Sequence, residues 1–462
     1  MEKESHASPF RIVMLPWLAH GHVSPYLELA KKLTARNFII YLCSTRANLT
    51  SIRSKLSKKF SESIQLVELE LPESDQLPSR YHTTNGLPPN LMATLKDAFD
   101  RSCPSFCRTL KRLKPNLVIY DLLQPWAPAA AASVCNIPSV VFVSSSATMS
   151  ALWYHSLTFP GTKFPFDSTI FYREYESDFA KRMVKPSKDK RRIMQCIQRS
   201  TDIVLVKGFR EIEGKYGDYW STLIEKKVVH VGHLVQDPAI NNDDDDDCEV
   251  IEWLNNKAKG STIFVSFGSE YFLSNKDLIE IAHGLELSNV NFIWVVRFPT
   301  GVENISLEEI LPQGFFTRVG DRGKIVTGWA PQVKILTHPN IGGFVSHCGW
   351  NSVLEGMKFG LPIIAMPMQL DQPINARLIE EVGVGIEVLR DSSGNLQRET
   401  ISKVINQVVK GIDGEQVRKK AKELSEEIGL KGDEEIDEVV KELVQLCLME
   451  KNTKIYPLPS DD

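Results

Sequence analysis

The chain has 462 residues, about three times the usual length of one domain, so we expect two domains with sizeable cores. Its 54 basic and 58 acidic side chains give a formal net charge of −4, which argues against a nucleic-acid partner bound by excess positive charge. The N-terminal apolar run from Ile12 to Leu18 is short and interrupted by Pro16, and no later run could span a bilayer. We therefore expect a cytoplasmic protein without membrane insertion, and a monomer.

The cysteines show no C-x-x-C pair and no spacing with histidines that would suggest a metal site. Their count is too low for a disulfide framework in so long a chain. We expect reduced thiols in a reducing compartment. The eight positions are Cys43, Cys103, Cys107, Cys135, Cys196, Cys248, Cys348 and Cys447.

Short β-branched or aromatic runs alternate with stretches of helical pattern along the chain. This alternation predicts parallel sheets covered by helices on both faces. The first series of predicted strands is 11–16, 37–44, 116–121, 139–145 and 202–208. A second series of the same type is 262–269, 291–297, 324–329, 342–347 and 362–367. The fold class predicted is α/β, with two Rossmann-like, doubly wound domains.

A polar stretch with five consecutive aspartates separates the two series and cannot bury apolar area. It predicts an interdomain linker, and a metal site built on these aspartates is the weaker interpretation because acidic linker clusters are usually just solvated. The residues after 399 have a helical pattern up to 448. The predicted boundaries are 1–236 for the N-terminal domain, 237–249 for the linker, 250–440 for the C-terminal domain and 441–462 for a final helix and tail.

Open α/β sheets bind ligands at the carboxyl ends of their strands, so residues just after each apolar run are candidates for a site. After the run 342–347 the sequence HCGWNS opens a stretch of helical spacing. A helix start carries unpaired N–H groups and a positive dipole end, and it attracts phosphate. Asn351 and Ser352 could add donors there, or could merely cap the helix.

The segment from Trp329 to Gln372, WAPQVKILTHPNIGGFVSHCGWNSVLEGMKFGLPIIAMPMQLDQ, has 44 residues. It resembles the signature box of plant family 1 UDP-sugar-dependent glycosyltransferases in length, at both ends, and at HCGWNS, E and DQ. That resemblance implies the GT-B fold, in which two Rossmann-like domains face a cleft, and a UDP-sugar as donor substrate with no cofactor.

The resemblance also implies a role for each residue of the donor site. Trp329 would stack on uracil, Gln332 would bind the nucleoside and Glu355 both ribose hydroxyls. The diphosphate would meet His347, Asn351, Ser352 and Ser269, and the sugar would meet Trp350, Asp371 and Gln372. A terminal glutamine in this box is typical of glucose users. Spacing agrees for Glu355, which follows Asn351 by four residues and so shares its helix face.

Simpler interpretations exist for several of these residues. The two tryptophans could be core aromatics and Glu355 a solvated helix residue. Asp371 could cap a helix beginning near Pro373, because aspartate before proline favours a helix start.

The first half offers two histidines, His20 and His22, after its first predicted strand. Ser24 and Pro25 predict a helix start, with Ser24 as N-cap, which would place His22 just before the helix. Gly21-His22-Val23-Ser24-Pro25 matches the G-H-x-x-P pattern of the family, which implies that His22 is the catalytic base. His20 falls where relatives vary, and we expect it at the rim of the pocket or in an exposed loop.

Asp121 follows the predicted strand 116–121 and matches the family's catalytic aspartate, although a turn aspartate is the simpler alternative. An anionic partner fixes the tautomer of a base histidine and stabilises its protonated form. The acceptor hydroxyl would then attack the anomeric carbon directly and invert its configuration. No D-x-D signature stands at a strand end, so we expect a metal-independent reaction.

Acceptor recognition is expected in the turn-rich, aromatic segments 73–92 and 146–166, although such stretches also suit packed surface loops. Several stretches, among them YHTTNGLPP and YDLLQPWAP, resemble the sugar-extending branch of the family. This implies transfer of a β-glucosyl unit from UDP-glucose to a sugar hydroxyl of a terpenoid, flavonoid or apocarotenoid glycoside. The alternatives are direct transfer to an aglycone hydroxyl or carboxyl, and a non-catalytic UDP-sugar-binding protein.

Overall fold

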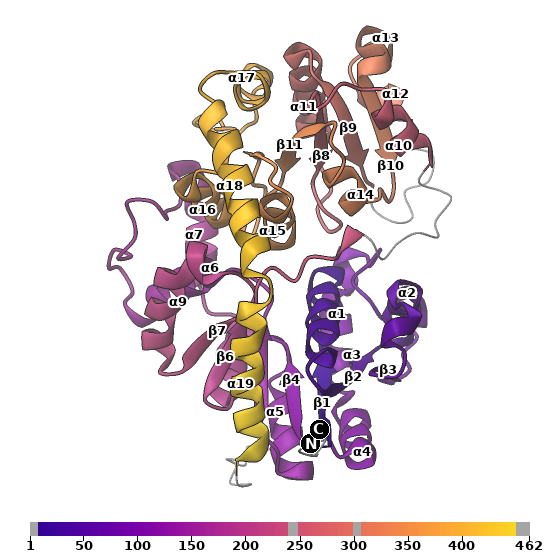
Figure 1. Ribbon diagram of the computed structural model, residues 1–462, viewed down its shortest axis with the longest axis vertical. Coiled ribbons are helices and arrows are strands. Elements are labelled where there is room, and N and C mark those ends of the chain that lie inside the picture. Colours follow the sequence, from indigo (N-terminus) through magenta and orange to yellow (C-terminus); the bar gives the residue numbers. More distant parts are fainter. Residues whose placement is uncertain (1–7, 239–247, 299–305, 450–462) are drawn as a thin grey trace, which may run out of the picture. The chain divides into compact units, whose positions relative to one another are not determined.

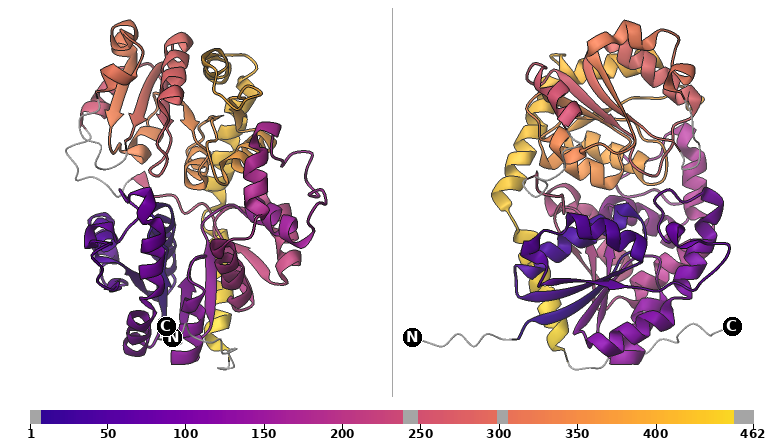
Figure 2. Two further views of the ribbon diagram at one scale, coloured as in Figure 1. Left: turned by 180° about the vertical axis from the view of Figure 1, so that it is seen from behind. Right: turned by 90° about the vertical axis from the view of Figure 1, so that its right-hand side faces the viewer.

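The computed structural model describes residues 8–238, 248–298 and 306–449. These residues divide into two compact units, and each is described by itself. Unit 1 comprises the residues up to 147, residues 186–234 and those from 433 on. Unit 2 comprises residues 148–185 and 235–432. Each unit is built around one parallel sheet with helices on both faces (Figures 1 and 2).

The sheet of unit 1 has seven strands in the order β3-β2-β1-β4-β5-β6-β7, all parallel. All residues of β4, β5 and β6 are buried, which explains their unbroken apolar sequences, because a parallel sheet is covered on both faces. The strands are β1 (Phe10–Leu15), β2 (Phe38–Ser44), β3 (Ile64–Glu68), β4 (Leu117–Tyr120), β5 (Ser139–Val143), β6 (Ile203–Val206) and β7 (Lys227–His230).

The helices of unit 1 include the last one described, α19 (Glu434–Leu448), which packs against β7 and α1 (Figure 1). Its buried residues Ile436, Val439, Leu443 and Leu446 recur at helical spacing and join the core of the sheet. The others are α1 (His20–Thr34), α2 (Arg46–Lys55), α3 (Met92–Asp100), α4 (Cys103–Leu113), α5 (Trp126–Ala130), α8 (Lys188–Arg199) and α9 (Arg210–Ile224).

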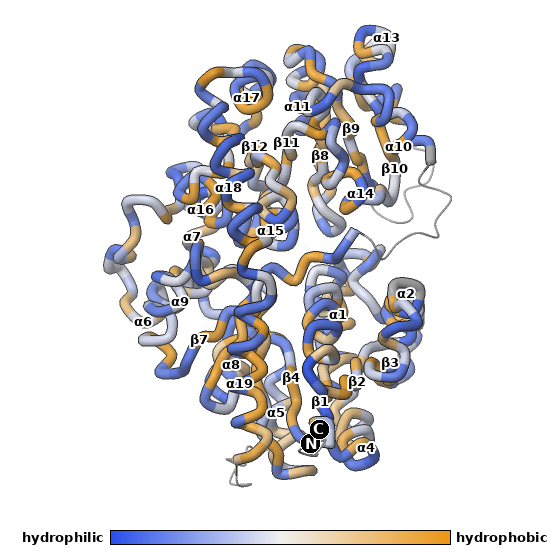
Figure 3. Tube along the Cα trace, viewed as in Figure 1, coloured by the Kyte–Doolittle hydropathy of each residue, from blue (hydrophilic) through white to orange (hydrophobic). Residues whose placement is uncertain are grey.

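The sheet of unit 2 has six parallel strands in the order β10-β9-β8-β11-β12-β13. They are β8 (Thr262–Ser266), β9 (Asn291–Val296), β10 (Gly323–Thr327), β11 (Ile341–Ser346), β12 (Ile363–Ala365) and β13 (Gly385–Glu387). As in unit 1, the strands are largely apolar, whereas α18 is mostly hydrophilic along its length (Figure 3).

The helices of unit 2 include two from the segment 148–185, which precedes the second series of strands in the sequence. They are α6 (Ala147–Thr158), α7 (Ser177–Val184), α10 (Cys248–Asn255), α11 (Asn275–Ser288), α12 (Leu307–Ile310), α13 (Phe315–Val319), α14 (Gln332–Leu336), α15 (Trp350–Lys358), α16 (Gln372–Val382), α17 (Arg398–Val409) and α18 (Glu415–Lys431). Ser425 of α18 donates a hydrogen bond to the Lys358 carbonyl at the end of α15, 2.7 Å away.

The predicted fold class is confirmed, and every predicted strand is present. The helical pattern at 399–448 corresponds to α17, α18 and α19. Three strands lack a counterpart in the sequence analysis, namely β3, β7 and β13, and each lies at an edge of its sheet.

The compact units differ from the predicted domain boundaries at two places. Residues 148–185 group with unit 2, where Glu176 is bonded to Arg377, and the return to unit 1 begins at 433 rather than near 440. Most of the predicted linker, including its five aspartates, and the tail after 449 lie outside the described residues.

Candidate active site

Three polar side chains meet at the carboxyl edge of the sheet in unit 1. The strand order reverses between β1 and β4, and this switch point is where open α/β sheets form ligand crevices. Asp121 directly follows β4, Ser144 directly follows β5, and His22 lies on α1 just beyond β1. Since β1 pairs with β4 and β4 with β5, these side chains come together from three neighbouring strands.

Asp121 is fully buried and its carboxylate is surrounded by donors. The backbone N–H of Trp17 donates to Oδ2 at 3.0 Å, and that of Leu122 donates to Oδ1 at 2.7 Å. His22 Nδ1 lies 2.9 Å from Oδ2 and 3.1 Å from Oδ1. These bonds offset the cost of burying the carboxylate, which would otherwise be several kcal/mol.

The contact with Asp121 assigns the tautomer of His22. An ionised carboxylate only accepts hydrogen bonds, so Nδ1 carries the proton and Nε2 keeps its lone pair. The Ser144 hydroxyl oxygen lies 3.2 Å from the same Nδ1. It can therefore accept the Nδ1 proton of His22 alongside the Asp121 carboxylate. His22 is half-buried, which leaves part of the ring accessible. A histidine in this state can accept a proton at Nε2.

The start of α1 differs from the prediction. The helix begins at His20 with Ala19 as N-cap, so His22 lies in its first turn and Ser24 is not the N-cap. Pro25 is the sixth residue of the helix and its ring lacks the N–H that would bond to the carbonyl of Gly21. The prediction was wrong because a proline so near a helix start is usually its first residue. His20 and His22 are therefore both helical, and both are half-buried.

The carboxyl edge of the second sheet gathers the predicted donor residues. Its order reverses between β8 and β11, and these residues follow β8, β10, β11 and β12 or begin the next helix. They are Ser269 after β8, Trp329 and Gln332 after β10, His347 after β11, Trp350, Asn351, Ser352 and Glu355 on α15, and Asp371 and Gln372 after β12.

Two glycines make room for His347. A Cβ atom added to Gly268 would lie 2.7 Å from His347 Nε2, and one added to Gly349 would lie 2.6 Å from it. Gly268 also has a φ of 77°, which other residues rarely adopt. Burial lowers the pKa of His347 to about 4, with a bond to the backbone of Ser266 acting in the opposite direction. The ring is therefore neutral near pH 7 and can donate one hydrogen bond.

The nine-residue helix α15 begins at Trp350, and its N-cap is Gly349. Neither Asn351 nor Ser352 caps it, because both lie inside the helix and the N-cap position has no side-chain hydrogen bond. The simpler interpretation of these two residues as caps is therefore wrong. The start of such a helix carries the positive end of the helix dipole, which attracts an anion.

A short chain of hydrogen bonds connects β8, α14 and α15. Ser266 Oγ donates to Gln332 Oε1 at 3.3 Å, and Gln332 Nε2 in turn donates to Glu355 Oε2. Gln332 and Glu355, predicted to bind the two parts of the nucleoside, are thus adjacent. Glu355 is half-buried and bonded on one oxygen, so it is not a solvated surface residue.

The two tryptophans of the predicted box have opposite environments. Trp329 is 60% exposed, whereas Trp350 is 4% exposed. The core interpretation thus fits Trp350 and does not fit Trp329. An exposed indole at the carboxyl edge of a sheet offers a flat face to a planar ring.

Asp371 and Gln372 are held by their neighbours at the start of α16. Asp371 is the N-cap residue but makes no capping bond, and its Oδ2 accepts from Asn375 Nδ2 at 3.0 Å. Gln372 Oε1 accepts from the backbone N–H groups of Met368 at 2.9 Å and Gln369 at 2.8 Å. With its oxygen so occupied, the amide of Gln372 is oriented to donate rather than accept.

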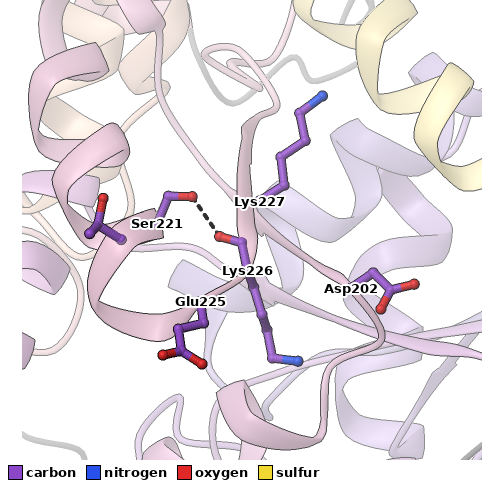
Figure 4. A pocket seen from close by; sticks show the side chains of 6 residues that line it. Asp202, Ser221, Glu225, Lys226 and Lys227 are labelled. Carbon is purple, nitrogen blue, oxygen red and sulfur yellow. Dashed lines mark hydrogen bonds between the residues drawn. The ribbon is translucent and has the colours of Figure 1, made fainter.

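Unit 1 also has a shallow hollow of about 460 Å³ at the opposite edge of its sheet, lined by Asp202, Ser221, Thr222, Glu225, Lys226 and Lys227 (Figure 4). Asp202 and Lys226 precede β6 and β7, so the hollow lies at the amino ends of the strands. Its two lysines are already engaged: Lys226 Nζ donates to the Ser200 carbonyl and Lys227 pairs with Glu438 and Glu442. We assign no ligand to it.

The remaining expectations concern metals, thiols and membranes. Among the described residues, no group of three or more histidine, cysteine or acidic side chains could hold a metal ion. Free thiols are found at Cys43, Cys103, Cys107, Cys135, Cys196, Cys348 and Cys447. No helix within the described ranges is long and apolar enough to cross a bilayer.

Sequence comparison matches both parts of the chain to known families. Residues 8–236 match the model of the glycosyltransferase N-terminal domain, and residues 222–426 match that of UDP-glucoronosyl and UDP-glucosyl transferases. The family matches, the fold and the polar residues at the carboxyl edges of the two sheets thus define a glycosyltransferase of the GT-B class that uses a UDP-sugar.

Similar proteins with known names narrow this class. UDP-glucosyltransferase 29 from Panax ginseng is 51% identical, with 96% of this chain and 98% of that protein covered. The β-D-glucosyl crocetin β-1,6-glucosyltransferase of Gardenia jasminoides is 49% identical over 94% of this chain and 98% of its own length. A Glycyrrhiza uralensis glycosyltransferase solved with glycyrrhetinic acid 3-O-monoglucuronide has a TM-score of 0.79 and 25% identity, with 95% and 96% of the chains covered. This chain belongs to the plant family 1 UDP-sugar-dependent glycosyltransferases, as its sequence predicted.

Proposed function

We propose that this enzyme is an inverting, metal-independent glucosyltransferase that adds a β-glucosyl unit from UDP-glucose to a sugar hydroxyl of a plant secondary-metabolite glycoside. The observation that carries the catalytic part is the buried Asp121 bonded to Nδ1 of His22. Binding a UDP-sugar needs neither residue. A protein that only bound the nucleotide would gain nothing from a histidine whose Nε2 is prepared to accept a proton.

In the proposed reaction His22 acts as general base. The acceptor hydroxyl gives its proton to Nε2, and its oxygen forms a bond to the anomeric carbon of glucose. The bond between that carbon and the diphosphate oxygen breaks, and UDP leaves with the electron pair. Asp121 holds the imidazole in the required tautomer and stabilises the imidazolium that forms. A single displacement of this kind converts the α-linked donor into a β-glucoside.

Donor binding is assigned to unit 2. Trp329 would stack on uracil, while Gln332 and Glu355 would hold the nucleoside. The first turn of α15, together with His347 and Ser269, would stabilise the leaving diphosphate, so that no metal ion is needed. Trp350, Asp371 and Gln372 would contact the sugar, with the Gln372 amide donating a hydrogen bond to a sugar hydroxyl because its oxygen is already bonded.

The nature of the acceptor is supported by the names of similar proteins. The Gardenia protein is named for transfer to glucosyl crocetin, which already carries glucose, and the Glycyrrhiza structure contains a glucuronide.

Direct transfer to an aglycone is the alternative, and other UDP-sugars are second to UDP-glucose as donor. Cytoplasmic location and a monomeric state stay predictions, the latter open to gel filtration.

The deciding experiment offers UDP-glucose with paired acceptors, each aglycone beside its monoglucoside, and reads products by mass spectrometry. We expect product from the glucosides only, and a β-linkage by NMR. Product from the aglycones instead would favour the alternative acceptor. Absence of any transfer while UDP binds would indicate a non-catalytic binding protein.

The catalytic assignment is tested by comparing the two histidines of α1. His22→Ala is expected to keep UDP binding and lose transfer, whereas His20→Ala keeps most of the activity. Equal loss in both variants would contradict the choice of His22. On the donor side, Glu355→Ala is expected to weaken UDP-glucose binding severely, and an unchanged affinity in a calorimetric titration would refute its role.

A further inference from the structure

One arginine of unit 2 is partly buried and has no acidic partner among the described residues. Arg297 directly follows β9 and is half-buried. Its Nε atom is buried without a hydrogen-bond partner, and no ion pair to its guanidinium occurs within the described ranges. Burial lowers the pKa of Arg297, and no carboxylate acts against it. Burying a cation without an acidic partner costs free energy, so we expect another group to stabilise the Arg297 guanidinium.

The neighbour that the structure provides is Trp329. The guanidinium carbon of Arg297 lies over the indole, 4.8 Å from the ring centroid. The two residues follow adjacent strands, since β9 pairs with β10 and the N–H of Gly328 donates to the Val296 carbonyl at 3.4 Å. A planar guanidinium stacks on an aromatic face and is attracted by its electrons.

This contact restricts the ring without covering it. Trp329 remains 60% exposed, so most of its surface is still accessible. The preceding Gly328 has a φ of 97°, a backbone conformation that other residues rarely adopt. Fixing a side chain before its ligand arrives lowers the entropy lost on binding.

We propose that Arg297 is a further donor-binding residue, which positions the Trp329 indole for the uracil ring and adds an unpaired positive charge for a nucleoside diphosphate. The proposal rests on the donor site proposed above. The anionic ligand supplies the negative charge that the described protein does not place beside Arg297. Arg297 is thus a positioning residue for the base and an electrostatic one for the phosphates.

The test measures the affinity of UDP and of uridine by calorimetry, and the quenching of tryptophan fluorescence, for Arg297→Met and Arg297→Lys. We expect Arg297→Met to weaken UDP binding about tenfold and to raise KM for UDP-glucose while KM for the acceptor is unchanged. Arg297→Lys keeps the charge but not the planar stack, so it should recover part of the UDP affinity. Uridine carries no phosphate, so its smaller loss should be similar in both variants.

Arg318→Met provides the matched control, because Arg318 is an exposed arginine of the same unit that pairs with Glu286. It should leave nucleotide affinity unchanged. Equal UDP affinity in wild type and Arg297→Met would overturn the inference, and so would tighter binding, which would mean that Arg297 occupies the place of uracil. If Arg297→Met does not fold, Arg297→Gln takes its place. A wild-type protein that does not bind UDP would refute the proposed function instead.

Discussion

At the scale of single residues, the contact between Asp121 and His22 carries the sharpest prediction. In Asp121→Asn the side-chain amide would face two backbone N–H donors with one oxygen, and the imidazole would lose its anionic acceptor. His22 would then favour the other tautomer, with its proton on Nε2. We expect kcat to fall by about 10²–10⁴ with UDP affinity unchanged, measured by initial rates and titration.

Two comparisons make this prediction specific. Ser144→Ala removes only the longer contact to His22 Nδ1, so kcat should fall by less than about tenfold. Asp97→Asn alters an aspartate on the surface of α3 and should change nothing. A loss in Ser144→Ala as large as that in Asp121→Asn would mean that the serine, rather than the carboxylate, orients the base.

At the scale of elements, sequence patterns were sufficient for the interior strands and for one edge strand, β10, and insufficient for the other three edge strands. Interior strands such as β4 are buried on both faces, so their sequences are continuously apolar and easy to recognise. Edge strands are paired on one side only. β3 carries exposed Gln65 and Glu68, β7 begins with exposed Lys227, and β13 begins with glycine, so none of them has the continuous apolar sequence of the interior strands.

Part of the candidate site could also be predicted from the buried strands, because some of its residues directly follow them. Asp121 was found because polar residues directly after a buried strand face the ligand edge. Ser144 and Arg297 occupy equivalent positions after β5 and β9, but neither belongs to a recognisable motif. The start of α1 was placed wrongly because Pro25 is tolerated inside a helix whose interior carbonyl bond it removes. The preference of proline for the first position of a helix could not reveal that α1 continues on the N-terminal side of Pro25.

The edge strand β7 ends in a histidine that should make stability depend on pH. Both ring nitrogens of His230 are buried without partners in the described structure. Burial lowers its pKa to about 4, aided by the charge of Arg210 and opposed by acidic groups on α9 and α19, namely Asp218, Glu211 and Glu438. Between that value and the ordinary 6.5, the unfolded chain binds more protons than the folded one, so stability is lost as the pH falls.

From this histidine alone we expect a loss of about 2 kcal/mol between pH 7.5 and pH 5, measured by urea unfolding. His230→Leu removes the titrating group and should reduce the loss by a similar amount. His283→Gln serves as control, because His283 lies on α11 in contact with Glu286. A pH dependence that stays the same in His230→Leu would contradict this explanation.

At the scale of the whole molecule, the chain path differs from a simple division into two halves. The segment 148–185 includes residues that the sequence assigned to acceptor recognition, yet it groups with unit 2, which holds the predicted donor residues. Burial and the charge of Asp371 raise the pKa of Tyr172, which places this segment beside a predicted sugar-binding residue. Conversely, α19 belongs to unit 1, where Lys32 pairs with Asp433 at 2.8 Å and Arg36 with Asp437 at 2.6 Å.

A buried ion network attaches that segment to unit 2. Arg377 of α16 donates two hydrogen bonds of 2.8 Å to Glu176 and a further one to Glu387 of β13. Arg173 donates to the same Glu387 at 2.8 Å. The side chains of Arg377, Glu176 and Glu387 are at most 4% exposed, so each depends on its partners for compensation.

Removing the shared cation should therefore cost more than neutralising one of its partners. Arg377→Ala leaves two buried carboxylates with less compensation, and we expect unit 2 to lose about 3–5 kcal/mol in urea unfolding. Glu176→Gln keeps an oxygen acceptor and leaves Glu387 paired, so its cost should be smaller, about 1–2 kcal/mol. Hydrogen exchange should nevertheless rise in residues 170–182 of Glu176→Gln, because the tie to α16 is weakened.

Arg318→Ala, which breaks an exposed pair, is the control and should have no measurable effect. A cost of Arg377→Ala below about 1 kcal/mol would mean that apolar packing, rather than the ion network, holds the segment 148–185 to the rest of unit 2.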